Sequence, residues 1–276
     1  MILERGQIAV VTGAASGIGF AVTRRLLDRG LSVVMADVEK SALDSAAEEL
    51  RESGVPDSSI MTAVVDVSDG PHMQQLAVAV IERFGRTDLL MNNAGVVGPR
   101  RPLWEQNEAD VDWIRAVNLD GVANGIRAFV PHMVAAGSGH VVNTSSVAAL
   151  TVIGGGGNGP YAASKHAVVG LSEVLQEDLL SAGVAVGVSV LCPGPVQTRI
   201  RDAARNRPLR SDAPATGAPT FVHSVATISA DEAARRTLAA VEAGRFWILT
   251  NAGNITEARE RLRRIAGDLD AEELSV

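Results

Sequence analysis

The chain has 276 residues, of which 46% are hydrophobic and 21% are charged, and its formal net charge is -7. This length and composition favour a single large α/β domain over residues 1–276, and the acidic balance speaks against a nucleic-acid partner. The single cysteine excludes an internal disulfide framework, and no apolar stretch is long enough to predict a membrane span. Since the start lacks the layout of a signal peptide, we expect a cytoplasmic protein. The five histidines lack metal-ligand spacing, so no metal site is predicted.

The first element predicted is a strand followed by a glycine-rich turn and a helix. Residues 8–12 form a short apolar run typical of a buried parallel strand. Gly13, Gly17 and Gly19 follow at once, and an apolar-periodic helix then runs to Gly30. Glycines let backbone N–H groups approach a pyrophosphate, and a helix N-terminus favours negative charge. The cluster alone is also compatible with a plain tight turn, but its place at the first strand–helix junction favours a nucleotide.

The second strand, predicted at 31–36, ends at a carboxylate. Asp37 follows Gly19 at a spacing close to that expected for the group that binds the adenine ribose hydroxyls. A carboxylate there would repel the additional phosphate of NADP, and Ala14 and Ala15 offer no cation to receive it, so the sequence predicts NAD as the cofactor. The alternative is that Asp37 caps the following helix.

The remaining elements alternate between strands and helices. Strands are predicted at 60–65, 88–91, 140–144, 184–191 and 245–250, and helices at 41–52, around 73–80, and at 104–135, 160–183, 231–242 and 255–266. Asp66 ends a strand, where it could bind adenine or cap the next helix. Asn118 is a poor residue inside a helix, so a local irregularity is expected there, the alternative being a solvent-facing side chain.

Tyr161 and Lys165 lie four residues apart in the predicted helix 160–183 and would therefore share one face. A nearby ammonium favours the phenolate and lowers the pKa of a phenol, which makes it a usable general acid and base. The alternative is a packed ring beside a solvated amine.

The segment 199–228 has no sustained periodicity and is interrupted by prolines, which is typical of a lid or binding loop. A C-terminal helix and tail occupy residues 254–276. Apolar residues near the expected active site predict a pocket for a bulky or cyclic ligand; they are Trp104, Val147, Ile153 and Phe221.

Several motifs occur together in order. They are Thr12-Gly13-x-x-x-Gly17-Ile18-Gly19, Asp66, Asn92-Asn93-Ala94-Gly95, Asn118, Ser146, Tyr161-x-x-x-Lys165 and Pro193-Gly194-Pro195-Val196-x-Thr198. On these motifs the chain resembles the short-chain dehydrogenase/reductase family over about residues 5–252. The resemblance implies one Rossmann-like domain, namely a doubly wound parallel sheet of about seven strands with helices on both faces. It also implies a nicotinamide-dependent oxidoreductase that forms a homotetramer or dimer.

The resemblance also implies roles for individual residues. Tyr161 would transfer the proton, Lys165 would lower its pKa and hold the nicotinamide ribose, Ser146 would polarise the substrate oxygen, and Asn118 would position a relay water. Ser146 precedes Tyr161 by about two residues more than is usual in the family, and Ser145 is the rival assignment. The implied cofactor-binding residues, besides Tyr161 and Lys165, are Gly13, Ser16, Gly17, Ile18, Gly19, Asp37, Asp66, Val67, Asn93, Ala94, Gly95, Pro193, Gly194, Val196 and Thr198.

The function predicted in this way is transfer of a hydride between NAD(H) and a small secondary alcohol or ketone. One alternative is reduction of a carrier-bound 3-oxoacyl thioester, a role that usually goes with NADPH and is therefore disfavoured by Asp37. Another is a non-catalytic NAD-binding sensor, which would have no need of Asn118, Ser146, Tyr161 and Lys165 together.

Overall fold

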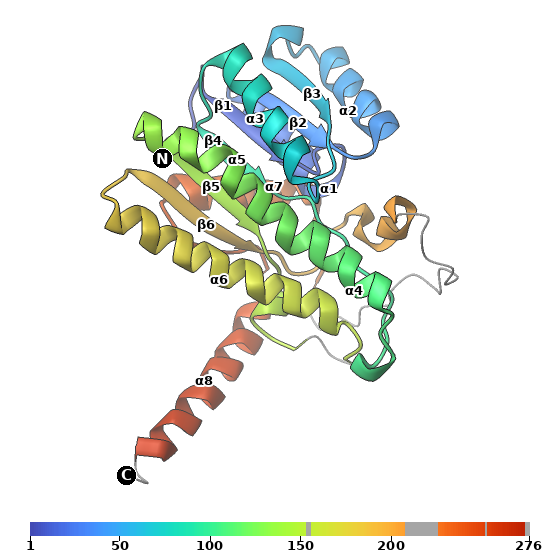
Figure 1. Cartoon of the computed structure of the whole chain (residues 1–276), viewed down its shortest axis with the longest axis vertical. Helices are drawn as coiled ribbons and strands as arrows, with labels where there is room; N and C mark the ends of the chain where they lie inside the picture. Colours follow the sequence, from blue (N-terminus) through green and yellow to red (C-terminus); the bar gives the residue numbers. More distant parts are fainter. Residues whose placement is uncertain (153–155, 208–225, 252, 274–276) are drawn as a thin grey trace.

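The computed structural model describes residues 1–152, 156–207, 226–251 and 253–273, and a parallel sheet forms its centre (Figure 1). Over these residues the sheet has seven strands in the order β3-β2-β1-β4-β5-β6-β7. The chain winds outward twice from the middle, because β1 pairs in parallel with both β2 and β4. The predicted doubly wound Rossmann-like fold is confirmed.

The central strands are the apolar runs that the sequence indicated, and their ends differ from the predicted ends by about two residues at most. The bounds are β1 Ile8–Thr12, β2 Ser32–Asp37, β3 Ile60–Val64, β4 Leu89–Asn92, β5 Gly139–Thr144, β6 Val186–Cys192 and β7 Trp247–Leu249. Because all pairings are parallel, the carboxyl ends of these strands meet at one edge of the sheet. Most of the residues proposed for cofactor binding lie at or just after those ends, and Asn118, Tyr161 and Lys165 come from helices.

Helices cover both faces of the sheet, as Figure 1 shows. Their bounds are α1 Gly17–Asp28, α2 Lys40–Glu52, α3 Gly70–Phe84, α4 Glu108–Arg115, α5 Gly121–Ala136, α6 Gly159–Ser181, α7 Ala230–Glu242 and α8 Gly253–Glu273. Leu26 of α1 and Leu238 of α7 belong to one buried apolar cluster. Phe129 of α5 and Leu175 of α6 belong to a second cluster, on the opposite face. Burial of these two layers is the main force that holds the sheet in place.

The predicted helical zone 104–135 is interrupted in the structure. Trp104 lies in a separate 3-10 turn, and helix α4 begins only at Glu108. A π-helix at Ala116–Asp120 then joins α4 to α5. The irregularity expected at Asn118 is therefore confirmed, whereas the alternative of a solvent-facing Asn118 is wrong because the side chain is buried. Such π-turns often occur at functional sites.

The last third of the chain departs most from the prediction. Residues Arg199–Asn206 form a 3-10 helix, while residues 208–225 of the expected lid lie outside the described residues. Helix α8 continues well beyond residue 266 into the acidic region and projects away from the body (Figure 1). Among the described residues, no helix is both long enough and apolar enough to cross a bilayer.

Candidate active site

Tyr161 and Lys165 lie on the buried face of α6, close to the end of β5. The Lys165 ammonium lies 5.8 Å from the centre of the Tyr161 ring and donates a hydrogen bond of 2.9 Å to the Thr144 carbonyl. Tyr161 is 9% exposed and Lys165 is 2% exposed, so Lys165 is not the solvated amine of the alternative interpretation. Pro160 at the start of α6 suits the first turn of a helix and fixes where this face begins.

Burial controls the protonation of both groups. It raises the pKa of the Tyr161 phenol, and a hydrogen bond with Ser146 partly opposes that rise. It also lowers the pKa of Lys165 to about 8. Desolvation disfavours the charged form of each side chain. In the protein alone the pKa of Tyr161 is therefore raised, with burial as the largest cause, and the lowering by Lys165 expected from the sequence stays a prediction for the protein with its cofactor.

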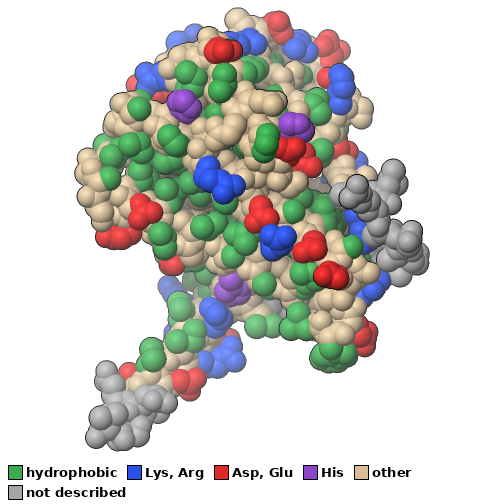
Figure 2. Space-filling model, viewed as in Figure 1, with side chains coloured by type: hydrophobic (Ala, Val, Ile, Leu, Met, Phe, Trp, Pro, Cys, Tyr) green, Lys and Arg blue, Asp and Glu red, His purple; other side chains and the backbone are tan. Residues whose placement is uncertain are grey.

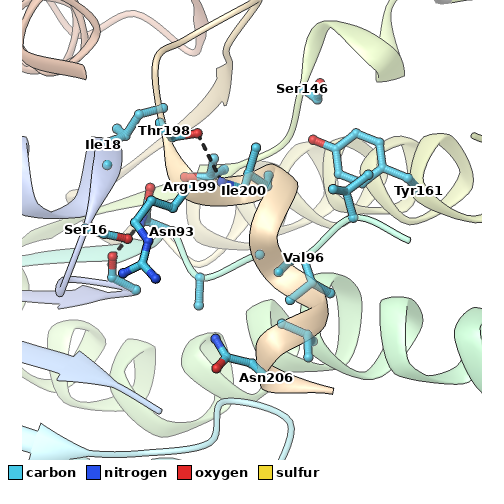
Figure 3. A pocket seen from close by; sticks show the side chains of 18 of the residues that line it. Ser16, Ile18, Asn93, Val96, Ser146, Tyr161, Thr198, Arg199, Ile200 and Asn206 are labelled. Atoms are coloured by element: carbon cyan, nitrogen blue, oxygen red, sulfur yellow. Dashed lines mark hydrogen bonds between the residues drawn. The ribbon is translucent and has the colours of Figure 1, made fainter. Parts of the chain in front are cut away.

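The two serines after β5 have different environments. The Ser145 hydroxyl donates to the Lys165 carbonyl at 2.7 Å, which uses its single proton inside the fold. The Ser146 oxygen accepts the Ala148 amide at 3.1 Å, and its own proton is directed to Tyr161 in the cavity. Figure 3 shows Ser146 and Tyr161 in the same part of the cavity. This difference favours Ser146 over Ser145 as the group that contacts a substrate oxygen.

Asn118 uses its side chain to hold the loop after β4. Its Oδ1 accepts the Val96 amide at 2.8 Å, and its Nδ2 donates to the Val96 carbonyl at 2.9 Å and to the Ser164 hydroxyl at 3.1 Å. The Ser164 hydroxyl in turn donates to the Tyr161 carbonyl. Asn118 thus connects the loop to the helix that carries Tyr161, and the π-helix places it there.

The glycine turn after β1 is closely packed, and the reason is geometric. Gly13 and Gly17 have φ angles of 65° and 57°, a region that favours glycine. A Cβ on Gly19 would lie 2.2 Å from the Gly13 carbonyl oxygen, so only glycine fits there. The Asn93 amide donates to the Thr12 carbonyl at 2.9 Å. Asn93 therefore holds this turn from β4, a supporting role that its motif did not indicate.

Carboxylates mark the other end of the site. Asp37 accepts the Ala15 amide with one oxygen and the Glu39 amide with the other, both at 3.0 Å. It joins the glycine turn to the start of α2, so its position fits both ribose binding and the capping alternative. Asp66 accepts the amide and the hydroxyl of Ser68. The alternative of Asp66 as the cap of α3 is wrong, because Asp69 accepts the His72 amide there.

A segment that we call the strap, Arg199–Arg207, crosses between the two ends. Arg205 Nε donates to both carboxylate oxygens of Glu39 at 2.9 Å, and Asn206 Nδ2 donates to one of these oxygens, also at 2.9 Å. These contacts lower the pKa of Glu39, the Arg205 hydrogen bond having the largest effect. Arg207 forms an ion pair of 2.6 Å with the buried Asp110. Charge pairs therefore fix this segment above the groove.

The site is a cavity of about 1060 Å³ bounded by the strand ends and the strap (Figure 3). This volume is at the upper end of ligand pockets, about 300–1,000 Å³. All the site residues named from the sequence line it except Gly19 and Asn118, which support it from behind. Trp104 does not line it and is 85% exposed, so its assignment to the pocket is wrong. Ile153 and Phe221 lie outside the described residues.

Several residues of the site escaped the sequence analysis. Trp113 lines the cavity and packs against Val96 and Ala203, at positions where the sequence showed only ordinary helix periodicity. Asn251, after β7, accepts the Gly194 amide at 3.1 Å and donates to the Pro195 carbonyl at 3.1 Å. It therefore fixes the loop that carries Val196 and Thr198. No local motif marks Asn251, because Gly194 and Pro195 are more than fifty residues away in the sequence.

The sequence of this chain is similar to those of known proteins. The family model described as short chain dehydrogenase matches residues 7–209, and the chain belongs to the short-chain dehydrogenase/reductase family. It is 42% identical over 246 residues to a 1-deoxy-11-beta-hydroxypentalenate dehydrogenase of Streptomyces avermitilis, covering 88% of this chain and 84% of that one.

Solved structures agree with this assignment. A short-chain dehydrogenase/reductase from Burkholderia phymatum in complex with NAD superposes with a TM-score of 0.89, at 39% identity and 97% coverage of both chains. A further relative was found by sequence. It is a 3-oxoacyl acyl-carrier-protein reductase of Thermotoga maritima, 35% identical over 193 residues that cover 70% of this chain and 75% of that one.

Proposed function

We propose that this oxidoreductase transfers a hydride between NAD(H) and a secondary alcohol or ketone, with Tyr161 as general acid and base. One observation carries the proposal: Tyr161, Ser146 and Lys165 border one end of a cavity whose other end is bordered by the glycine turn and Asp37. A dinucleotide needs both ends, since its pyrophosphate binds at a helix N-terminus and its ribose at a carboxylate.

The residues present fit NAD. Gly13, Ser16 and Ile18 would hold the pyrophosphate, and Asp37 would hold the adenosine ribose. Asp66 and Val67 would contact the adenine. Asn93, Ala94 and Gly95 would line the adenosine side of the cavity. Lys165 would hold the nicotinamide ribose, and Pro193, Gly194, Val196 and Thr198 the nicotinamide. Asp37 and Glu39 both present negative charge where NADP carries its additional phosphate, which supports NAD. The complex of the Burkholderia phymatum relative with NAD supports the same choice, although solved relatives with NADP also occur.

The chemistry follows from the side chains. A bound nicotinamide supplies the hydride acceptor or donor. The Ser146 hydroxyl holds the substrate oxygen, and the Tyr161 oxygen removes the hydroxyl proton during oxidation or returns it during reduction. The Lys165 ammonium stabilises the phenolate, and Asn118 keeps the loop at Val96 and the α6 face in register. Relatives named for hydroxypentalenate and for levodione support a cyclic alcohol or ketone as substrate.

A direct assay tests the proposal. Cyclic secondary alcohols and hydroxysteroids are offered with NAD, and formation of reduced nicotinamide is followed by its absorbance. We expect turnover by the unaltered protein and a fall of about 10³-fold in kcat for Tyr161→Phe, with the Kd for NAD unchanged. Retained turnover in Tyr161→Phe would contradict the acid–base role. Tight NAD binding without turnover on any substrate would favour a sensor.

The Thermotoga maritima relative gives a second candidate, reduction of a 3-oxoacyl thioester. That reaction would be favoured by activity on acyl-carrier thioesters with NADPH. Paired measurements of Kd for NAD and NADP separate the two candidates, and we expect NAD to bind at least about tenfold more tightly. Equal affinities would remove the role given to Asp37.

A further inference from the structure

Helix α8 carries an apolar stripe that the rest of the described chain does not cover. Its first turns rest on the body, where Ala258 is buried, and the helix then continues into solvent (Figure 1). On that projecting part Leu262, Ile265 and Leu269 are 61%, 43% and 63% exposed. Figure 2 shows hydrophobic side chains along this arm next to cationic ones.

The stripe has the spacing of a helix that pairs with another helix. Ile255, Ala258, Leu262, Ile265 and Leu269 are separated alternately by three and four residues, which is the a and d pattern of a heptad repeat. The part of α8 that projects beyond Ala258 has about 15 residues, a length at which an isolated helix is marginal in water, and Gly267 weakens it further. Packing of the stripe against a partner would supply the missing stability. Ala258 of the stripe is already buried, so the exposed positions continue the same face of the helix away from the body.

Charges beside the stripe identify the partner. Arg261 and Asp268 each precede an apolar position and lie on the same flank, one heptad apart. Consider two α8 helices that pair antiparallel, with Leu262 of one copy packed against Ile265 of the other. In this register Arg261 of each copy faces Asp268 of the other copy. The two-fold symmetry of the pair repeats this ion pair, so it forms twice. One register therefore buries the apolar side chains and also places both arginines opposite aspartates. In a parallel pair Arg261 would face Ala266, and the complementarity would be lost.

We propose that α8 is a dimerisation arm that pairs antiparallel with α8 of a second copy of this chain. The arm is separate from the cavity, so the proposal does not depend on the assigned chemistry. A membrane surface is the competing occupant, since the arm also carries Arg259, Arg263 and Arg264. That occupant would not require Arg261 and Asp268 at heptad spacing.

Charge reversal of the full-length chain tests the register. Sedimentation equilibrium measures self-association of the unaltered protein, of Arg261→Asp, of Asp268→Arg and of the double variant. Each single reversal places like charges opposite each other twice, and we expect it to weaken the arm-mediated association about tenfold or more. The double variant restores both pairs and should associate like the unaltered protein. Binding of NAD, unchanged in all four, reports correct folding.

Mixing the two single variants gives the most specific test. An equimolar mixture of Arg261→Asp and Asp268→Arg brings opposite charges together at both sites of a mixed pair. We therefore expect the mixture to associate more strongly than either variant alone. The proposal is overturned if the unaltered protein is monomeric, if the reversals leave its assembly unchanged, or if mixing restores nothing. Binding of the arm to vesicles of anionic phospholipid without self-association would also overturn it and assign the arm to a membrane surface.

Discussion

At the nicotinamide end of the cavity, Tyr161 and Lys165 are buried, and burial sets their protonation. At the adenosine end, Glu39 is partly exposed, and its charge is set by the hydrogen bonds of Arg205. Chemistry that moves a proton requires groups whose neutral and charged forms are close in free energy. Desolvation brings the two forms of Lys165 closer at neutral pH, whereas it moves the two forms of Tyr161 further apart in the protein alone. The carboxylate proposed for the ribose, Asp37, is held by backbone amides, and the charge of the neighbouring Glu39 is fixed by its ion pair with Arg205. One groove therefore contains two kinds of electrostatic control.

The largest expected effect separates two adjacent serines at the buried end. Ser146→Ala removes the hydroxyl donor beside Tyr161, and we expect kcat to fall about 10²-fold. Ser145→Ala is the matched control, because the Ser145 hydroxyl donates its proton to the Lys165 carbonyl. Steady-state kinetics of both variants decide the matter. A larger loss of kcat in Ser145→Ala would exchange the two assignments.

The second effect concerns stability at the same end. The fall in the pKa of Lys165 from 10.5 to about 8 corresponds to a cost of about 3 kcal/mol for keeping its ammonium buried at neutral pH. Lys165→Met removes that cost and loses a hydrogen bond to Thr144 worth about 1 kcal/mol, so we expect a net stabilisation of about 2 kcal/mol at pH 7. Urea unfolding measures the difference.

The cost of burying the Lys165 ammonium should also make the free energy of unfolding depend on pH. Between pH 8 and 10.5 the unfolded chain binds more protons at Lys165 than the folded one, so the stability of the unaltered protein rises with pH across that window. The difference in the free energy of unfolding between Lys165→Met and the unaltered protein should therefore decrease as the pH rises. Lys40→Met, at an exposed site, is the control and should show no such trend. An advantage that does not change with pH would contradict the account of burial.

The smallest expected effect is on cofactor choice at the paired end. Glu39→Gln removes a negative charge and leaves Arg205 free to attract the additional phosphate of NADP. We expect the ratio of Kd for NADP to Kd for NAD to fall about tenfold. Glu48→Gln, an exposed carboxylate of the same helix, serves as the control. Titration calorimetry with both dinucleotides provides the values, and an unchanged ratio would leave Asp37 as the sole determinant.

The sequence was informative wherever a residue's neighbours in the chain determine its environment. Apolar runs predicted the strands, Gly13 and Gly17 predicted the turn, and the four-residue spacing predicted the shared face of Tyr161 and Lys165. Contacts between distant segments were not predictable: Arg205 binds Glu39 across more than 160 residues, and Asn251 binds the loop at Gly194.

Two further failures have the same origin. Trp104 was assigned to the pocket on its apolar character, yet its turn holds it in solvent. The pKa of Tyr161 was inferred from the nearby Lys165, whereas the burial that dominates it arises only when α6 packs against β5 and the loop at Val97.

The central claim is that a buried phenol beside Lys165 becomes an acid–base group when the cofactor binds. Tyr161 is the only tyrosine in the chain, so the ultraviolet absorbance of phenolate reports on it alone. Titration of the protein with and without NAD is the direct test. For the protein alone we expect a pKa of Tyr161 above the ordinary value of a phenol. With NAD bound we expect a lower pKa, because the oxidised nicotinamide adds positive charge nearby. A pKa that is the same with and without NAD would contradict the account.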